Sequence, residues 1–479
     1  MSFNFTNLAR LLIDDPRVAK LRALIVDRIQ PSFKKGLPAD IIAKGKSILR
    51  QLNKSQQRAV LRTLMANDYS LLKGFPGTGK TSTIVALVQL MLALGYSVLL
   101  TSYTHSAVDN ILLKLKSCEV DFLRLGKTSR IHPDIKEYSD ERLTSVFRDV
   151  KSLADFYDDK LVVATTCLGT NHVLFSRRIF DFCIVDEASQ VLQPAVLGPL
   201  FQAHRFVLVG DPQQLPPLIQ SSEARDLGMG ESLFARLDSL GATSCLTQQY
   251  RMNGHIMKLA NLLMYDGQLQ CANSALETAT ITLPNYTNEE CTTTFPGWIK
   301  RAASSNLENS VVFLDTCGCA PEDQNSNVSA KEASLILVLI ISFLKAGLNI
   351  DDIGVITPYR DQVKYLRNLI TKNVTNGSRV EVNTVDQYQG RDKSVILYSC
   401  VRSATSKPKN GDILQDEHRL NVAITRAKYK LILIGDISTL QNYKPFKTLI
   451  SLFMESSQVY TLRDGIDGFH WSDFNPYCN

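Results

Sequence analysis

The apolar positions of this chain fall into short runs that alternate with longer stretches of helical spacing. Each short run ends in glycine, hydroxyl or carboxylate residues, as buried strands do at the edge of a sheet. The runs predict strands at 69–73, 96–100, 161–166, 182–185 and 206–209, and again at 311–314, 353–357, 380–382, 395–399 and 430–434. Strands that alternate with helices predict parallel sheets covered on both faces. We therefore expect an α/β fold with two such sheets in tandem.

The remaining segments set the expected domain limits. Leucines and isoleucines recur at helical spacing between residues 1 and 50, which predicts a short helical N-terminal arm with no chemistry of its own. The strand–helix pattern restarts near Gly241, and residues 267–310 are rich in Thr, Asn and Ser and predict a loop-rich insertion. We expect a first α/β domain over 51–240, a second over 241–465 and a C-terminal tail over 466–479.

Composition narrows the class of protein only a little. The 479 residues include 53 Lys and Arg against 47 Asp and Glu, so the net charge of +6 permits a nucleic-acid partner without requiring one. The longest apolar run, 335–344, is too short to span a membrane. Asp14 and Asp15 interrupt the apolar start of the chain, so the sequence predicts no signal peptide. Ten cysteines form no CxxC pair, and the close pair Cys317 and Cys319 fits no common zinc or iron–sulfur spacing, so we expect reduced intracellular thiols.

Residues 74–81 read GFPGTGKT and fit the phosphate-binding pattern G-x-x-x-x-G-K-[ST]. They follow one predicted strand and open a predicted helix at 82–91, which is the context that a phosphate cradle needs. Glycines let backbone N–H groups turn toward a polyphosphate. Lys80 supplies a charge for the β- and γ-phosphates, and the Thr81 hydroxyl can ligate Mg²⁺. The residues expected to bind ATP are Gly74, Phe75, Pro76, Gly77, Thr78, Gly79, Lys80 and Thr81.

Carboxylate and amide side chains near this loop predict the rest of an ATPase site. Asp186 and Glu187 end a buried strand, where Asp186 can hold the Mg²⁺ hydration shell and Glu187 can orient and deprotonate the attacking water. Gln214 follows the next strand and could sense the γ-phosphate. Gln56 lies just before the phosphate loop, and its amide offers the donor and acceptor that suit the paired edge of adenine. With one phosphate loop, one acidic strand end and two α/β halves, the chain fits a RecA-like tandem.

Hydroxyl-rich segments follow two further predicted strands. Residues 101–110 read TSYTHSAVDN, and the strand at 161–166 ends in two threonines. Loops at the carboxyl ends of parallel strands bind ligands in open α/β sheets. Hydroxyls and a helix start in that place can hold phosphodiester oxygens.

Eight motifs occur in the order found in superfamily 1 helicases: Gln56, GFPGTGKT, TSYTHSAVDN, DEASQ, GDPQQLPP, QYRM, VNTVDQYQGRDKS and RLNVAITRAK. The form DEASQ resembles the 5′-to-3′ subgroup. THSAVDNILLKL, the LGPL before GDPQQLPPL, and HRLNVAITRAK are similar to the helicase part of the eukaryotic DNA replication ATP-dependent helicase/nuclease family. The resemblance covers residues 50–440 and implies an ATP-driven 5′-to-3′ translocase and helicase on single-stranded DNA.

The same resemblance implies roles for residues whose types alone do not reveal them. Tyr250 would stack on the adenine and Arg251 would reach the γ-phosphate. Arg426 would be an arginine finger supplied by the second domain, so that hydrolysis needs both domains. Gly390 and Asp392 would contact the nucleotide and couple it to the strand. The positions that match contacts to the strand backbone are Thr104, His105, Thr166 and Thr384.

The family's biology gives further expectations. It implies a role in DNA replication and repair in the nucleus, with a mitochondrial pool. It implies 5′ flaps of Okazaki fragments and resected ends as substrates, and a single-strand-binding protein as a partner. The family's nuclease domain with its iron–sulfur cysteines precedes the helicase, whereas here only some fifty residues precede Gln56. We therefore expect no nuclease activity and no iron–sulfur cluster in this chain, which could be a fragment, an isoform or a partial gene model.

Three other readings compete with a DNA helicase. An RNA helicase of the nonsense-mediated-decay type shares the motifs, and residue types do not separate deoxyribose from ribose readers. A small-molecule kinase with a phosphate loop would leave QYRM and Arg426 unexplained. A non-catalytic nucleic-acid-binding scaffold would not need every catalytic position, yet all are present. Stimulation of ATP hydrolysis by DNA or by RNA separates these readings.

Overall fold

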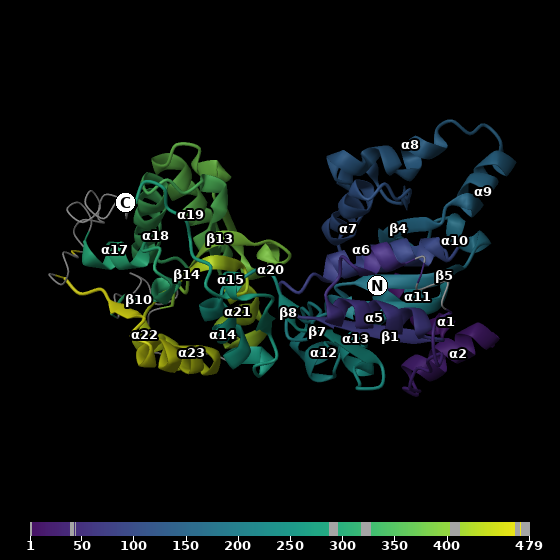
Figure 1. Cartoon of the computed structure of the whole chain (residues 1–479), viewed down its shortest axis with the longest axis horizontal. Coiled ribbons are helices and arrows are strands. Elements are labelled where there is room, and N and C mark those ends of the chain that lie inside the picture. The colour runs from purple at the N-terminus through teal and green to yellow at the C-terminus, as the bar shows by residue number, and fades with distance from the viewer. Residues whose placement is uncertain are drawn as a thin grey trace. The chain divides into compact units, whose positions relative to one another are not determined.

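The computed structural model describes residues 2–38, 43, 45–286, 296–317, 327–402, 412–464 and 470. The chain divides into two compact units, Met1–Gln248 and Gln249–Asn479, here called unit 1 and unit 2 (Figure 1). The division comes after the predicted boundary at residue 240, because Thr243–Leu246 pairs with the first strand and completes its sheet. Cys319, residues 287–295 of the predicted insertion and, His470 excepted, the predicted tail at 466–479 lie outside the described residues.

Unit 1 is built on a parallel sheet. Within its described residues seven strands follow the order β3-β4-β2-β5-β6-β1-β7, and every pairing is parallel. Consecutive residues face opposite sides, so that Leu71 and Leu72 enter different cores. The strands are β1 (Tyr69–Gly74), β2 (Val98–Ser102), β3 (Leu123–Arg124), β4 (Val162–Thr166), β5 (Phe180–Asp186), β6 (Ala203–Gly210) and β7 (Thr243–Leu246).

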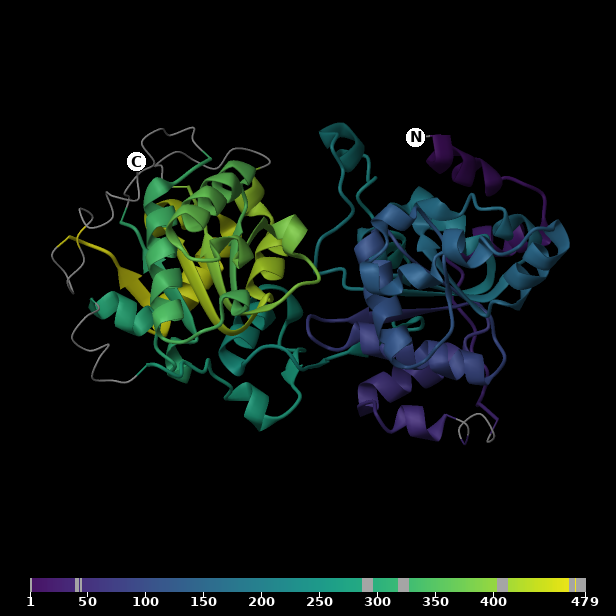
Figure 2. The ribbon, with the colours of Figure 1, turned by 90° about the horizontal axis from the view of Figure 1, so that it is seen from above.

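Helices cover both faces of this sheet. One core contains apolar side chains of α5, α6 and α7, and the other contains Leu11, just after α1, with apolar side chains of α2, α10, α11 and α13. The predicted arm contains helices and belongs to unit 1, where Asn7 donates to the Pro194 carbonyl of α11 at 2.9 Å (Figure 2). The helices are α1 (Ser2–Arg10), α2 (Pro16–Ile25), α4 (Lys46–Leu49), α5 (Lys54–Met65), α6 (Lys80–Ala93), α7 (His105–Ser117), α8 (Asp140–Thr144), α9 (Val150–Asp159), α10 (Leu174–Arg177), α11 (Gln193–Leu200), α12 (Ser222–Asp226) and α13 (Leu233–Leu237).

Unit 2 repeats the design. In its described part six strands form a parallel sheet in the order β12-β11-β13-β14-β10-β15, and β8 pairs with β9 in a separate ribbon. The predicted strand at 353–357 coincides with β11. The strands are β8 (Gln248–Gln249), β9 (Gln270–Cys271), β10 (Val311–Asp315), β11 (Ile353–Thr357), β12 (Glu381–Thr384), β13 (Lys393–Ser399), β14 (Ala427–Gly435) and β15 (Val459–Thr461).

The sheet of unit 2 also lies between two layers of helices. One core joins α17, α18 and α19 to the strands, and on the opposite face Phe453 of α23 meets Phe313 edge-on at 5.7 Å. The helices are α14 (Gly254–Ala260), α15 (Ser274–Glu277), α17 (Gly297–Ala302), α18 (Ala330–Lys345), α19 (Arg360–Asn373), α20 (Val385–Tyr388), α21 (Glu417–Ile424), α22 (Ile437–Leu440) and α23 (Lys444–Glu455). The predicted α/β class with two parallel, RecA-like sheets is thus confirmed.

None of the helices in the described ranges is both long enough and apolar enough to cross a lipid bilayer. The longest apolar run of the sequence belongs to α18, whose side chains fill the core of unit 2.

Candidate nucleotide and nucleic-acid site

The predicted ATPase residues of unit 1 meet at one edge of its sheet. The phosphate loop follows β1, the two adjacent carboxylates close β5, and the GDPQQ segment follows β6. The sheet order places β6 between β5 and β1. Because all three strands are parallel, their carboxyl ends share one edge, which is where open α/β sheets bind ligands.

The phosphate loop has the backbone that its glycines allow. Gly77 and Gly79 take left-handed φ values of +74° and +79°, and between them Thr78 donates its hydroxyl to the Phe75 carbonyl at 2.7 Å. Helix α6 begins at Lys80, and its N-cap, Gly79, makes no side-chain cap bond. The first N–H groups of α6 therefore meet no capping side chain, which fits an anionic phosphate.

Lys80 lies folded over this loop. Its Nζ donates to the Gly74 carbonyl at 2.8 Å, so the charge is already at the loop. A Cβ on Gly74 would stand 2.3 Å from Lys80 Cγ, closer than any side chain tolerates. Gly74 therefore gives the lysine side chain its path, in addition to any role it has toward phosphate.

Gln56 braces the loop from α5. It is 5% exposed, its Nε2 donates to the Thr78 carbonyl at 3.1 Å, and its Oε1 accepts from the Asn53 N–H at 3.0 Å. A Cβ on Gly79 would lie 2.7 Å from the same Nε2. Both ends of this amide are engaged with the protein, and the role of Gln56 toward adenine stays a prediction.

Asp186 is the buried carboxylate of the site. It is 6% exposed, and its Oδ1 has no hydrogen-bond partner among the described residues. Burial, and after it the charge of Glu187, raises the pKa of Asp186 to about 7, although Lys80 acts in the opposite direction. A buried carboxylate oxygen without a partner is costly unless a cation or its water satisfies it.

These residues fit a magnesium ion bound together with a nucleotide. Protein sites give Mg²⁺ one or two ligands and leave the rest to water and substrate phosphates. Asp186 and Thr81 are residues of that kind. Over the described ranges no group of three or more His, Cys, Asp or Glu side chains could hold a metal ion.

Glu187 leaves the strand in an unusual conformation. Its φ of +52° lies in the left-handed region, which few residues with a side chain adopt. Gln190 donates its amide to Glu187 Oε2 at 2.9 Å and orients the carboxylate. Such strain concentrates at functional sites, where the surrounding structure holds it in place.

Gln214 lies in a hydrogen-bonded loop beyond β6. It is 3% exposed and donates to Asp211 Oδ2 at 2.8 Å. The Asp211 N–H donates to the Ser189 hydroxyl at 3.3 Å, which ties this loop to the segment after Glu187. A Cβ on Gly210 would stand 3.0 Å from the Ser189 backbone nitrogen. Ser189 and Asp211 were not predicted, although both belong to the quoted motifs.

Two of the nucleotide residues predicted in unit 2, Arg251 and Asp392, belong to an ion cluster. Arg251 donates its Nε to Asp392 Oδ2 at 2.9 Å and its Nη1 to the Thr425 carbonyl at 3.0 Å. Lys428, which the sequence did not single out, lies 3.1 Å from Asp392 Oδ1. Burial opposes ionisation of Asp392, but Arg251 and Lys428 outweigh it and lower its pKa.

The neighbouring predicted residues differ in exposure. Gly390 has a φ of +78° and open space where a Cβ would stand, with nothing within 4 Å of that position, and Tyr250 is 50% exposed. Arg426 is only 2% exposed, and its Nε donates to the Val422 carbonyl at 2.8 Å. Its guanidinium is thus held within unit 2, just before β14. Its role as an arginine finger stays a prediction.

The candidate strand contacts of unit 1 gather on the other side of β5. Register pairs Ser102 with Thr166 and with Asp186, so the ends of β4, β2 and β5 are neighbours. Thr104 follows β2, caps α7 by accepting from the Ala107 N–H at 3.2 Å, and is exposed. His105 opens α7 beside it. Thr384 belongs to unit 2, at the carboxyl end of β12, and is 8% exposed.

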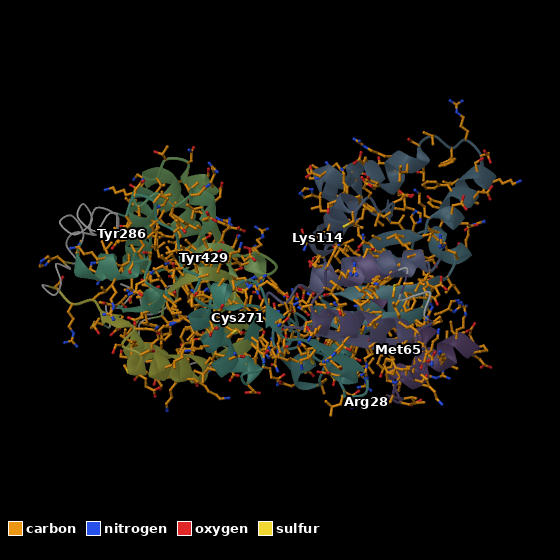
Figure 3. All side chains as sticks on the ribbon, viewed as in Figure 1. Arg28, Met65, Lys114, Cys271, Tyr286 and Tyr429 are labelled. Atoms are coloured by element: carbon orange, nitrogen blue, oxygen red, sulfur yellow. The ribbon has the colours of Figure 1, made fainter. Side chains whose placement is uncertain are left out.

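Helix α7 connects these contacts to the nucleotide side of unit 1. It packs against α6, the helix that the phosphate loop opens. Lys114 of α7 is labelled in Figure 3. It donates to the Ser82 hydroxyl at 3.4 Å, one residue beyond Thr81. The helix that carries His105 and the helix that follows the phosphate loop are thus in direct contact.

Comparisons with known proteins agree with this geometry. Two family models, each described as an AAA domain, match this chain. One matches residues 51–152 and 148–222, and the other matches residues 229–438. The DNA replication ATP-dependent helicase/nuclease DNA2 of Xenopus laevis is 48% identical over 483 residues, 97% of this chain and 45% of that protein. The human protein of that name is 47% identical, and the aligned region covers 93% of this chain and 43% of the human protein. The protein of that name from Saccharomyces cerevisiae is 39% identical, and the aligned region covers 95% of this chain and 30% of the yeast protein.

A solved structure described as Arterivirus nonstructural protein 10 (helicase) with DNA aligns with 82% of this chain and 66% of its own, at 16% identity and a TM-score of 0.42. The sequence relatives are far more similar, although the chain spans less than half of their length. Both phosphate loop and acidic strand end lie in the matched region. The chain is thus homologous, over nearly its whole length, to DNA replication ATP-dependent helicase/nuclease proteins, and two of its regions match AAA-domain models.

Proposed function

We propose that this chain is an ATP-dependent 5′-to-3′ translocase and helicase that acts on single-stranded DNA. The observation that carries the proposal is the sheet edge of unit 1. There a phosphate loop with an uncapped helix start lies on one side of β6. On the other side lies a buried carboxylate oxygen that has no hydrogen-bond partner in the described part of the chain. That arrangement suits a nucleotide with its magnesium ion. The names of the matched relatives support replication as the context.

Within this proposal each site residue has a task. Lys80 and the loop glycines hold the phosphates, and Thr81 and Asp186 hold Mg²⁺. Glu187 accepts a proton from the attacking water, and Gln214 senses the γ-phosphate. Gln56 and Tyr250 bind the base. Arg251 and Arg426 stabilise the charge that develops on the transferred phosphoryl group. Gly390 and Asp392 link the nucleotide to the strand.

The strand would be held by its backbone. Hydroxyls and helix starts meet phosphates without reading bases, so Thr104, His105, Thr166 and Thr384 would grip the strand irrespective of sequence. Because these residues come from both units, a cycle of nucleotide binding and hydrolysis can alternate the tighter grip. This alternation would move the strand in one direction.

The biological setting follows from the family. We propose a nuclear protein, with a mitochondrial pool, that acts on 5′ flaps and resected ends beside a single-strand-binding protein. We assign no nuclease activity to this chain. Incubation with a 5′-flap substrate, Mg²⁺ and no ATP should give no cleavage above that of a mock preparation. Cleavage that copurifies with the protein and survives Lys80→Ala would contradict this.

The proposal is tested by ATP turnover in the presence of different strands. We expect weak hydrolysis without nucleic acid, strong stimulation by single-stranded DNA and weaker stimulation by RNA of the same sequence. Displacement of streptavidin from the 3′ end but not from the 5′ end of a biotinylated strand would support 5′-to-3′ movement. Stronger stimulation by RNA would favour an RNA helicase, and no stimulation by either strand would favour a scaffold.

A further inference from the structure

Arg124 is a fully buried cation beside the predicted strand contacts of unit 1. Its side chain is 0% exposed. Its Nε donates to Asp109 Oδ1 at 2.8 Å, and its Nη1 donates to the Leu125 carbonyl at 2.6 Å. The remaining terminal nitrogen, Nη2, lies 3.0 Å from His105 Nδ1. One guanidinium thus ties a buried carboxylate, a backbone carbonyl and the imidazole of His105 together.

The fold holds both ends of this contact. His105 and Asp109 are four residues apart on α7, so they share one face of the helix. Arg124 lies on β3, opposite Ala164 of β4, and bridges to Ser139 on its other side. Asp109 also accepts the His132 N–H at 2.9 Å, so its carboxylate cannot turn away from the arginine. The imidazole is therefore held at a fixed place next to the end of β2.

The contact determines which imidazole nitrogen carries the proton. A guanidinium has five N–H donors and no acceptor. A bond between Nη2 and Nδ1 therefore requires Nδ1 to accept with its lone pair. In the neutral ring the proton must then lie on Nε2, which makes no hydrogen bond with any of the described residues. The side chain thus keeps one N–H donor for something outside the protein.

The charges around His105 favour this neutral form. Burial and then the charge of Arg124 lower the pKa of His105, with Arg130 acting in the same direction. Asp109 is the carboxylate that opposes them. An imidazolium would carry a second N–H donor at Nδ1, directed at a guanidinium that cannot accept it. Protonation would therefore break the contact that places the ring.

We infer that Arg124 is a positioning residue that holds His105 as the neutral Nε2–H tautomer, and that this N–H donates to a phosphodiester oxygen of the bound strand. The inference rests on the proposed function for the strand contact, but not for the tautomer. It makes His105 a directional donor and not an additional positive charge. The strand would then gain a fixed register at the end of β2, with little added salt dependence from this residue.

The tautomer is measured directly on the intact chain. In protein labelled with ¹⁵N-histidine, long-range ¹H–¹⁵N spectra distinguish a protonated ring nitrogen from an unprotonated one, and His105→Gln identifies the signals. We expect His105 to have a bare Nδ1 and a protonated Nε2 throughout pH 6.5 to 8. A protonated Nδ1, or a doubly protonated ring over that range, overturns the inference. Because no variant other than the assignment control is needed, misfolding cannot obscure the result.

The donor role is tested by two matched substitutions. Counting bonds from Cγ, the amide nitrogen of Gln stands where Nε2 stands, and that of Asn stands where Nδ1 stands. We expect His105→Gln to bind a fluorescent oligonucleotide within about threefold of the unsubstituted chain, and His105→Asn to lose about tenfold, as His105→Ala does; the larger loss corresponds to one hydrogen bond to a charged acceptor. Equal affinity for all three variants would overturn the donor role.

A third variant links the two measurements. In Arg124→Gln the hydrogen-bond partner of His105 Nδ1 is changed, and we expect a mixture of His105 tautomers. We also expect a lower affinity for the strand, which increases as the pH is lowered from 8 to 6. An unchanged tautomer in this variant contradicts the positioning role. If wild-type ATP turnover does not respond to any strand, the proposed function has failed, whereas a wrong tautomer with normal strand stimulation is a failure of this inference alone.

Discussion

Gly79 occupies a position of the phosphate loop where any larger side chain would collide with Gln56. Its φ is +79°, and a Cβ there would stand 2.7 Å from Gln56 Nε2. We predict that Gly79→Ala lowers ATP affinity by tenfold or more, because the alanine must strain the loop or expel the Gln56 amide from the Thr78 carbonyl. A left-handed alanine alone costs about 1 kcal/mol. Titration with a fluorescent ATP analogue measures the loss.

Gly95 provides the matched control for this substitution. Its φ is +76°, but nothing lies within 4 Å of a Cβ at that position. Gly95→Ala should therefore lower the free energy of unfolding by about 1 kcal/mol and leave ATP affinity unchanged. Equal ATP affinity in the two alanine variants would show that the Gln56 brace has no part in nucleotide binding.

Glu187 is the residue on which hydrolysis itself should depend. We predict that Glu187→Gln binds ATP and single-stranded DNA normally but turns over about 10²–10⁴-fold more slowly, the usual contribution of a positioned acid or base. The amide keeps the shape and the Gln190 contact but cannot accept the proton of water. Strand-stimulated phosphate release measures the effect, and Glu223→Gln on exposed α12 is the control. Near-normal turnover would remove Glu187 from the mechanism.

Much of the candidate site was visible in the residues because its motifs are contiguous. The phosphate loop and the Asp186–Glu187 pair are each defined by neighbours in sequence, and the fold brings them to one edge. Lys428 and Arg124 could not be predicted in this way. Each acts through a partner from another segment of the chain, Asp392 or His105. Although Lys428 closes the quoted motif RLNVAITRAK, no local pattern shows which side chain such a cation meets.

Among the helices and strands, the long apolar strands were all predicted, whereas several of the shortest strands were missed. Strand β11 was found at its full length because five consecutive buried residues leave a clear apolar run. Strands β3, β7 and β15 have only two to four residues, and what makes them strands is pairing with β4, β1 and β10. Pairing is a tertiary contact, so the sequence pattern alone cannot reveal it.

Helix α18 carries a buried acid that links it to the end of β13. Glu332 is 2% exposed, accepts the Ser399 hydroxyl at 2.6 Å and accepts the Val401 N–H at 3.0 Å. Burial raises its pKa to about 7, although these donors act in the opposite direction. Between the unfolded value of 4.5 and that folded value, the folded state binds more protons. The free energy of unfolding must then fall as pH rises through this window.

We predict that Glu332→Gln removes this pH dependence. The glutamine does not titrate, so unit 2 of the unsubstituted chain should lose on the order of 2–3 kcal/mol of stability relative to the variant between pH 5 and pH 8. Urea unfolding followed by fluorescence of buried Trp298, in a Trp471→Phe background, reports on unit 2. Exposed Glu308→Gln is the control. A constant difference between the two proteins at both pH values would contradict the buried, protonated acid.

For the whole molecule, the residues expected to act on one ATP belong to two separate units. Lys80, Asp186 and Glu187 lie in unit 1, and Arg251 and Arg426 lie in unit 2. Each set is internally ordered by its own hydrogen bonds. We propose that hydrolysis requires both sets, with unit 1 sufficient to bind the nucleotide and unit 2 needed for turnover.

Nucleotide affinity and DNA-stimulated turnover, measured together in Arg426→Ala, test whether unit 2 is needed for hydrolysis. Lys80→Ala, which removes a charge from the phosphate loop, is the contrast and should lose both. Because Arg426 is buried and donates to the Val422 carbonyl, Arg426→Lys and an unfolding measurement establish that unit 2 remains folded. We predict near-normal ATP affinity and a loss of turnover of about 10³–10⁵-fold for a finger of this kind. Near-normal turnover in folded Arg426→Ala would contradict an ATPase centre shared by both units.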